Sequence, residues 1–260
     1  MKTKIISKTG KKEVELPKCF SGKIREDILQ KVFEAEKGMQ RQAYGSKYMA
    51  GAGYSASGIL KHARHKWKTT YGKGISRVPR KIFSRHGASF NWEAATIASA
   101  RGGRRAHPPK PEKNWFRKIN KKEKKIAFCS AFAGTVNPDA LERKYKDKVK
   151  SGFVISSDFL KLKTKEIKKM LDDAFENPKI WKTSSIRAGK GKLRGRRHKT
   201  NAGLLVVIGD NEKLKCNGID IVNVSRLKIN DLAPNGEPGR IAGYTEKAIE
   251  EIEKKFGGKK

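Results

Sequence analysis

The sequence is short of acidic residues and of long apolar runs. Of its 260 residues only 26 are Asp or Glu, against 61 Lys or Arg, so the formal net charge is +35. Such a surplus destabilises a compact free-standing domain by self-repulsion and attracts polyanions. No apolar run approaches the ~18 residues of a membrane-spanning helix, and the first residues lack the apolar core of a signal peptide. We therefore expect neither a membrane partner nor export.

Cysteine is also scarce. Cys19, Cys129 and Cys216 are far apart, and no C-x-x-C spacing occurs. An odd number without that spacing argues against a disulfide framework or a zinc finger, and favours a reducing, cytoplasmic compartment. Hydrophobic residues make up only 36% of the chain, below the ~45–50% usual in soluble domains. We expect part of the chain to lack a core of its own.

Two stretches, residues 1–40 and 116–260, carry regular apolar patterns and predict one globular domain. The expected strands are 4–6, 13–16, 153–155, 180–183, 204–208 and 219–224. The expected helices are 24–35, 121–133 with Asn120 as cap and Gly134 as stop, 138–149, 164–175 and 246–256. Strands that alternate with helices predict an α/β fold with a mostly parallel sheet of about four strands.

Residues 41–115 are different, and we expect a long extended internal loop without its own core. They hold 16 Lys or Arg but only two acids, together with nine glycines and nine aromatic residues. Interleaved cations, rings and glycines suit RNA, because cations neutralise phosphates and rings stack on unpaired bases. For Trp67 and Trp92 we favour stacking on bases, with packing against the globular domain as the alternative.

A second basic cluster spans residues 182–199, with eight Lys or Arg and no acid. It lies between two expected strands. Small residues alternate with cations there, so the backbone can follow a phosphate chain closely.

Motifs for catalysis, cofactors or metals are poorly represented. No dinucleotide fingerprint follows a strand, and no phosphate-binding G-x-x-x-x-G-K-[ST] loop occurs. His62 and His65 have no carboxylate or thiol nearby, Asp172-Asp173 fits a solvated helix face, and Asp210 is interpreted as a turn. We predict no catalytic residues, no cofactor and no metal. Two alternatives stay open: an RNA-processing enzyme with a basic substrate arm, and a chromatin-like architectural protein.

Several motifs occur in order along most of the chain. They are QAYGS at 42–46, YGKG at 71–74, RVPR at 77–80, GGRRAHPPKPEK at 102–113, RAGKGKLRGR at 187–196, DLAPNGEPGR at 231–240 and YTEKAI at 244–249. Together they resemble the large-ribosomal-subunit protein L-four family in its archaeal and eukaryotic form. The basic motifs at 102–113 and 187–196 are the most specific of them.

The resemblance implies a three-layer α/β/α domain, residues 1–40 and 116–260, with an inserted rRNA-penetrating loop at 41–115. It implies a structural protein of the cytoplasmic large ribosomal subunit that binds rRNA early in assembly. The inner loop, around residues 67–91, would help to line the polypeptide exit tunnel. The implied partners are large-subunit rRNA, neighbouring large-subunit proteins including another exit-tunnel protein, and the nascent peptide near the loop tip.

The expected rRNA-binding residues follow from the basic motifs. Cations should contact phosphates, glycines should allow close backbone approach, and Trp67 and Tyr71 should stack on bases. The set is Arg64, Lys66, Trp67, Tyr71, Gly72, Lys73, Gly74, Arg77, Arg80, Arg101, Gly102, Gly103, Arg104, Arg105, His107, Lys110, Arg187, Lys190, Lys192, Arg194, Arg196 and Arg197.

Overall fold

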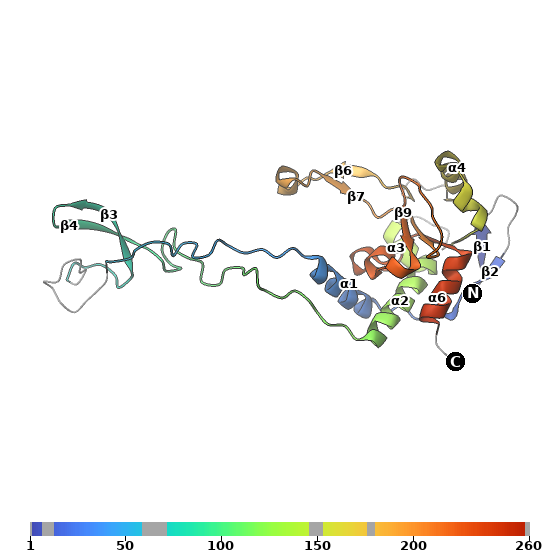
Figure 1. The fold of residues 1–260 in the computed structure, drawn as a ribbon, viewed down its shortest axis with the longest axis horizontal. Coiled ribbons are helices and arrows are strands. Elements are labelled where there is room, and N and C mark those ends of the chain that lie inside the picture. Colours follow the sequence, from blue (N-terminus) through green and yellow to red (C-terminus); the bar gives the residue numbers. More distant parts are fainter. Residues whose placement is uncertain (1, 7–12, 59–71, 146–152, 176–179, 258–260) are drawn as a thin grey trace. The chain divides into compact units, whose positions relative to one another are not determined.

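A computed structural model of the chain describes residues 2–6, 13–58, 72–145, 153–175 and 180–257 (Figure 1). Contacts between residues divide the chain into two units. One unit, here called the globular unit, combines Met1–Gln40 with Phe116–Lys260, and the other, here called the inserted unit, is Arg41–Trp115. Each unit is described by itself.

The globular unit is built on a six-stranded sheet with the order β2-β1-β5-β10-β8-β9. The strands are β1 (Lys2–Ile6), β2 (Glu13–Glu15), β5 (Phe153–Ile155), β8 (Leu205–Ile208), β9 (Asp220–Asn223) and β10 (Ala242–Thr245). Only β2 is antiparallel to its neighbour; β1, β5, β10, β8 and β9 run parallel. The predicted α/β fold with a mostly parallel sheet is confirmed, with six strands in place of about four.

Two strand predictions differ from the structure. Residues 180–183 form no strand, and the next extended element begins at Ser184. Strand β10 was not predicted, because its sequence Ala-Gly-Tyr-Thr shows no apolar alternation. A packing requirement explains the glycine: a Cβ atom on Gly243 would lie 2.6 Å from the ring of Phe153 in the neighbouring strand.

Of the six α-helices in the described residues, five overlap predicted ones; the first runs over 26–40 in place of 24–35, and the short helix at 229–232 was not predicted. The helices are α1 (Glu26–Gln40), α2 (Lys121–Val136), α3 (Pro138–Tyr145), α4 (Thr164–Phe175), α5 (Ile229–Leu232) and α6 (Glu246–Phe256). The predicted stop of α2 at Gly134 is wrong, because Pro238 packs against the bare glycine and the helix continues to Val136. Asn120 is the N-cap residue but its side chain makes no capping bond, and Glu123 pairs with Lys31 at 2.9 Å. Part of the predicted helix at 138–149 lies outside the described residues.

The helices cover both faces of the sheet and give three layers (Figure 1). Leu205 and Val207 of β8 point into a core formed with α1, α2, α5 and α6. Val206 and Ile208 of the same strand point into a second core formed with α3 and α4. This alternation of fully buried side chains is what a strand covered on both faces requires. The implied α/β/α arrangement is therefore present.

The cysteines lie in or beside these cores. Cys19 belongs to the first core and Cys216 to the second, and all three thiols are free. Burial, with a smaller contribution from neighbouring Cys129, raises the pKa of the Cys19 thiol to about 12, so it stays protonated and unreactive at neutral pH. Among the described residues, no helix has the length and apolar character to cross a membrane.

Candidate nucleic-acid interface

A small antiparallel hairpin, β6 (Ser184–Ile186) with β7 (His198–Thr200), extends from the globular unit (Figure 1). Between the two strands the chain makes a 3-10 turn, Lys190–Arg194, which ends at Gly195 in a left-handed conformation with φ of 74°. The hairpin contains no buried side chain from residue 182 to residue 200. Its structure therefore depends on backbone pairing and on contacts at its base.

The hairpin carries the second group of predicted cations, and all of them are exposed or nearly so. They are Arg187, Lys190, Lys192, Arg194, Arg196 and Arg197. None forms an ion pair with a carboxylate of the described residues, and none lies beside an acid in the sequence. Their guanidinium and ammonium groups are thus available to an external anion such as a phosphate chain.

The inserted unit holds two lengths of chain against each other, and glycines allow the contact. A Cβ atom on Gly45 would lie 2.5 Å from the ring of Pro111. A Cβ atom on Gly51, whose φ is 77°, would lie 2.6 Å from the backbone of Arg104. The motif at 102–113 thus packs on residues 45–51 of its own unit.

The inserted unit also contains regular structure that was not predicted. Strands β3 (Arg80–His86) and β4 (Ser89–Ala94) form an antiparallel hairpin (Figure 1). Gly58 forms an isolated β-bridge with Arg80. Phe90 and Ala95 are buried in it. The sequence shows no apolar alternation for this hairpin, because its strands carry several cations and only one of their side chains, that of Phe90, is buried.

Trp92 has a structural role within this hairpin. Its ring stacks on Phe90 with centroids 5.2 Å apart, and a Cβ atom on Gly58 would lie 2.4 Å from it. Trp92 thus has packing partners within its own unit that the sequence did not predict. The Phe83 ring, by contrast, is not covered by the hairpin, since this residue is 76% exposed.

The predicted cations of the inserted unit are almost all exposed. The exposed ones are Lys73, Arg77, Arg101, Arg104, Arg105 and Lys110, and the predicted His107 is exposed as well. Arg80 is half-buried, and its guanidinium donates to the Ser76 hydroxyl at 2.9 Å, so part of its role is to hold the turn before β3. None of these side chains has a carboxylate partner in the part of the chain that the structure describes.

Cations and rings also pair where the two ends of the inserted unit meet. The Arg41 guanidinium lies 3.9 Å from the Trp115 ring centroid and 5.4 Å from that of Tyr44, and the Lys113 ammonium lies 4.3 Å from Trp115. Tyr44 and Trp115 line an open groove together with Arg105, which adds a cation to the same surface. Such a surface offers both charge and stacking faces, the two groups that bind unpaired nucleotides.

The predicted glycines divide into two kinds. Gly103 permits a close backbone approach, since a Cβ atom there would lie 1.9 Å from the Ile97 carbonyl oxygen. At Gly72, Gly74 and Gly102, no atom of the described chain lies within 4 Å of the place that a Cβ atom would take, and their positive φ values are what favours glycine. Arg64, Lys66, Trp67 and Tyr71, like the pair His62 and His65, lie outside the described residues.

Carboxylates near the strand ends have structural roles. Asp210, which follows β8, accepts hydrogen bonds from the amide and hydroxyl of Ser225, and these lower the pKa of its carboxyl. Glu212 accepts from the Gly209 amide at 2.9 Å and from the Thr245 hydroxyl at 2.6 Å. Across the described residues no group of His, Cys, Asp and Glu has the arrangement of a metal site. These side chains fix the loops after β8 and β9.

The fold and these surfaces define a class: an α/β/α protein with exposed, acid-poor cationic segments. The family described as "Ribosomal protein L4/L1 family" matches residues 14–255. The large ribosomal subunit protein uL4 of Nanoarchaeum equitans is 40% identical over 248 residues, which cover 92% of each chain. The uL4 of Methanospirillum hungatei is 36% identical over 272 aligned residues, 99% of each, and that of Methanopyrus kandleri 34% over 260, 94% of each. The chain belongs to the ribosomal protein L4/L1 family.

Proposed function

We propose that this protein is a structural constituent of the large ribosomal subunit, serves translation in the cytoplasm, and binds rRNA early in assembly. It has no catalytic role. Family membership supports this assignment at the level of the whole chain. The main structural support for rRNA binding is a set of exposed cations in the inserted unit and in the β6–β7 hairpin. These cations have no carboxylate partners among the described residues.

The mechanism is charge neutralisation combined with fitting of shape. Lysine and arginine side chains of both segments contact phosphates and release condensed counterions. Glycines such as Gly103 keep the chain narrow, so that it can lie between RNA helices. The groove lined by Tyr44, Arg105 and Trp115 adds stacking faces for unpaired bases.

The inserted unit acts in the rRNA interior. Its inner part, around residues 67–91, helps to line the exit tunnel and lies near the nascent peptide. Neighbouring large-subunit proteins, including another tunnel protein, contact the same region. The β3–β4 hairpin supports this proposal because it is cationic, carries backbone pairing of its own and presents Phe83 outward.

The salt dependence of rRNA binding tests the proposal. Binding of the purified protein to large-subunit rRNA should weaken steeply between about 50 and 200 mM salt, by roughly 10³-fold or more if at least about six phosphates are contacted. A nearly flat dependence would contradict the electrostatic mechanism. Turnover of any RNA by the protein would favour a processing enzyme, and equal affinity for duplex DNA would favour an architectural chromatin-like protein.

A further inference from the structure

The β6–β7 hairpin joins the globular unit through two short segments at its base. We call residues 180–183 the outgoing leg and residues 201–204 the returning leg. The legs pair with each other, since the Leu204 amide donates to the Ile180 carbonyl at 2.8 Å. The outgoing leg is also fixed to α4, because the Trp181 indole donates to Asp172 at 2.7 Å.

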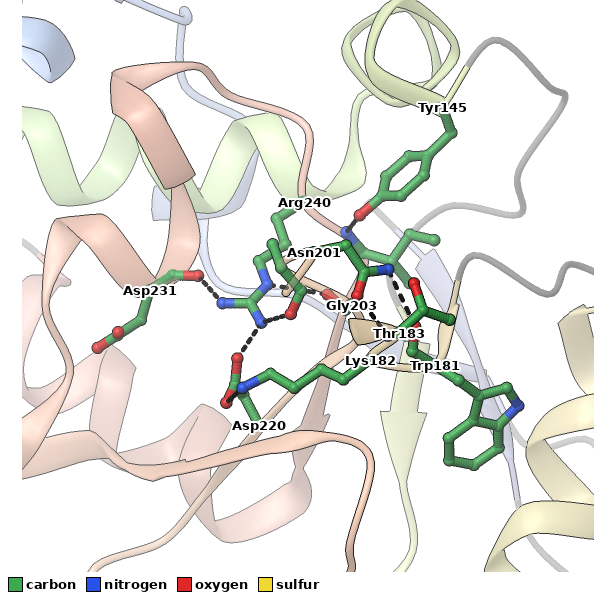
Figure 2. Close-up of polar contacts among 11 residues, drawn as sticks. Tyr145, Trp181, Lys182, Thr183, Asn201, Gly203, Asp220, Asp231 and Arg240 are labelled. Atoms are coloured by element: carbon green, nitrogen blue, oxygen red, sulfur yellow. Dashed lines mark hydrogen bonds and ion pairs between the residues drawn. The ribbon is translucent and has the colours of Figure 1, made fainter. Parts of the chain in front are cut away.

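Asn201 ties the two legs together with its side chain. Its carbonyl oxygen accepts from the Thr183 amide at 2.7 Å, and its amide group donates to the Trp181 carbonyl at 2.9 Å. Both bonds cross from the returning leg to the outgoing leg (Figure 2). The side chain itself is exposed, so it contributes to the base of the hairpin without belonging to a core.

Arg240 binds the returning leg from inside the globular unit. It is only 3% exposed, and Figure 2 shows its guanidinium between Gly203, Asp220 and Asp231. Its Nε donates to the Gly203 carbonyl at 3.0 Å, and one terminal nitrogen donates to the Asp231 carbonyl at 2.6 Å. The other terminal nitrogen donates to the Ala202 carbonyl and to the Asp220 carboxylate. A planar, always charged group with five donors suits this position.

Asp220 extends the same network to the outgoing leg. One carboxylate oxygen accepts from Arg240 and the other from the Lys182 ammonium. Burial alone would raise the pKa of Asp220, but the bonds from Lys182 and Arg240 outweigh it and the pKa is lowered. The carboxylate is therefore ionised at neutral pH, and the two legs are connected through one ion-paired unit.

The position of this network matters because the hairpin has no core to fix its direction. Residues 182–199 carry eight Lys or Arg and no acid, so their charges repel one another. No side chain between residues 182 and 200 of the described hairpin is buried. A loosely attached hairpin would lose conformational entropy on binding, whereas a fixed one would lose little.

We propose that Arg240, Asp220 and Asn201 are positioning residues that hold the hairpin in one direction. The hairpin cations are therefore already arranged for binding before they contact rRNA phosphates. The proposal rests on the proposed rRNA-binding function. It adds that the affinity of the hairpin depends on contacts at its base as well as on its exposed charges. Truncating Arg240 itself would leave three carbonyl oxygens without their donor and Asp220 with Lys182 alone, and it risks unfolding, so exposed partners make the better test.

The experiment compares two variants of the base with two matched controls in the full-length protein. Asn201→Ala and Lys182→Met weaken the base. Asn217→Ala removes an exposed asparagine whose side chain has no hydrogen bond to either described leg, and Lys199→Met removes an exposed hairpin cation. Two quantities are measured: affinity for a large-subunit rRNA fragment across a salt series, and hydrogen exchange of the hairpin amides in the protein without RNA.

The positioning role predicts a specific pattern. Asn201→Ala should speed exchange of the Arg187 and Leu204 amides and weaken rRNA binding by roughly fivefold to tenfold, the size of one lost hydrogen bond, with an unchanged salt slope. Lys182→Met should also leave the slope unchanged, because its charge is already paired with Asp220. Lys199→Met should lower the slope by about one and leave exchange unchanged, and Asn217→Ala should change neither.

Three results would overturn the positioning role. One is faster exchange in Asn201→Ala with wild-type affinity, which would mean that the direction of the hairpin is unimportant for binding. The second is a lower salt slope in Lys182→Met, which would make Lys182 a phosphate contact. The third is unchanged exchange in Asn201→Ala, which would show, without any RNA measurement, that Asn201 does not hold the base of the hairpin. A wild-type protein that fails to bind rRNA would instead contradict the proposed function.

Discussion

At the residue scale, Gly103 occupies a position where the backbone leaves no room for a side chain. Its amide donates to the Ala100 carbonyl at 3.0 Å, and a Cβ atom would lie 1.9 Å from the Ile97 carbonyl oxygen. Because that neighbour is backbone, it cannot rotate away as a flexible side chain could. The close turn at 97–103 therefore requires glycine at this point.

Gly103→Ala should destabilise the inserted unit by about 1–3 kcal/mol, the usual cost of overpacking, and should weaken rRNA binding. Faster hydrogen exchange across residues 49–104 measures the loss. Gly53→Ala is the matched control, since the atom nearest to its Cβ position, the Met49 carbonyl oxygen, is 4.0 Å away and its φ is not positive. Equal exchange in the two variants would contradict the steric argument.

Lys144 predicts a pH dependence of stability. Burial lowers the pKa of its ammonium to about 8 from 10.5, although Glu237 acts in the opposite sense. The unfolded chain therefore holds more protons than the folded one between pH 8 and 10.5, and stability from this group rises with pH in that window. Below pH 8 the two states are equally protonated and the contribution is flat.

The difference in unfolding free energy between wild type and Lys144→Met should thus change by at most about 3 kcal/mol across this window, in favour of the wild type as pH rises. Denaturant titrations at a series of pH values measure it. The comparison removes the titrations of thiols and phenols that both proteins share. A difference that stays constant, or that moves against the wild type as pH rises, would show that Lys144 is not desolvated.

Single residues also mark how far the sequence could predict the site. The exposure of most of the site's cations was predictable, because burying a Lys or Arg without a carboxylate partner is costly. The structural role of Trp92 was not predictable, since its stacking on Phe90 depends on a hairpin whose sequence shows no apolar alternation. The position of Arg240 against the base of the hairpin was not predictable either, because its partners are backbone carbonyls and one carboxylate distant in sequence.

At the element scale, α2 shows how a local signal can be overridden. Glycine is a poor helix residue, and Gly134 predicts an end to the helix. In the structure α2 continues to Val136, because the bare glycine lets Pro238 pack directly on the helix. By contrast α4 and α6 have the predicted bounds, since their amphipathic periods agree with the cores they cover.

Gly134→Ala tests this packing. Helix propensity alone would stabilise the variant by about 1 kcal/mol. A Cβ atom would, however, lie 2.6 Å from Pro238, so we expect a net loss of about 1–2 kcal/mol by thermal or denaturant unfolding. Gly189→Ala, where no atom lies within 4 Å of the new Cβ, should be neutral. A more stable Gly134→Ala protein would mean that the turn at Pro238 moves at little cost.

At the scale of the whole molecule, the two units differ in how each is stabilised internally. Both cores of the globular unit consist only of residues outside 41–115. The inserted unit has a small hairpin of its own and otherwise exposes cations. The charge surplus of +35 is thus concentrated in part in segments that the cores do not require.

Removing residues 41–115, with a short Gly/Ser linker joining Gln40 to Phe116, should preserve the far-UV circular dichroism and cooperative unfolding of the globular unit. The same deletion should lower both rRNA affinity and its salt slope, because it removes many phosphate contacts. Loss of cooperative unfolding would contradict the independence of the two cores from the inserted unit.

The central claim is that this chain is a structural protein of the large ribosomal subunit. Sedimentation of the native protein from cell extract through a sucrose gradient tests it most directly. The account predicts stable co-migration with the large subunit, and release only when high salt strips proteins from rRNA. Migration of the protein at the top of the gradient, separate from the large subunit at low salt, would contradict it.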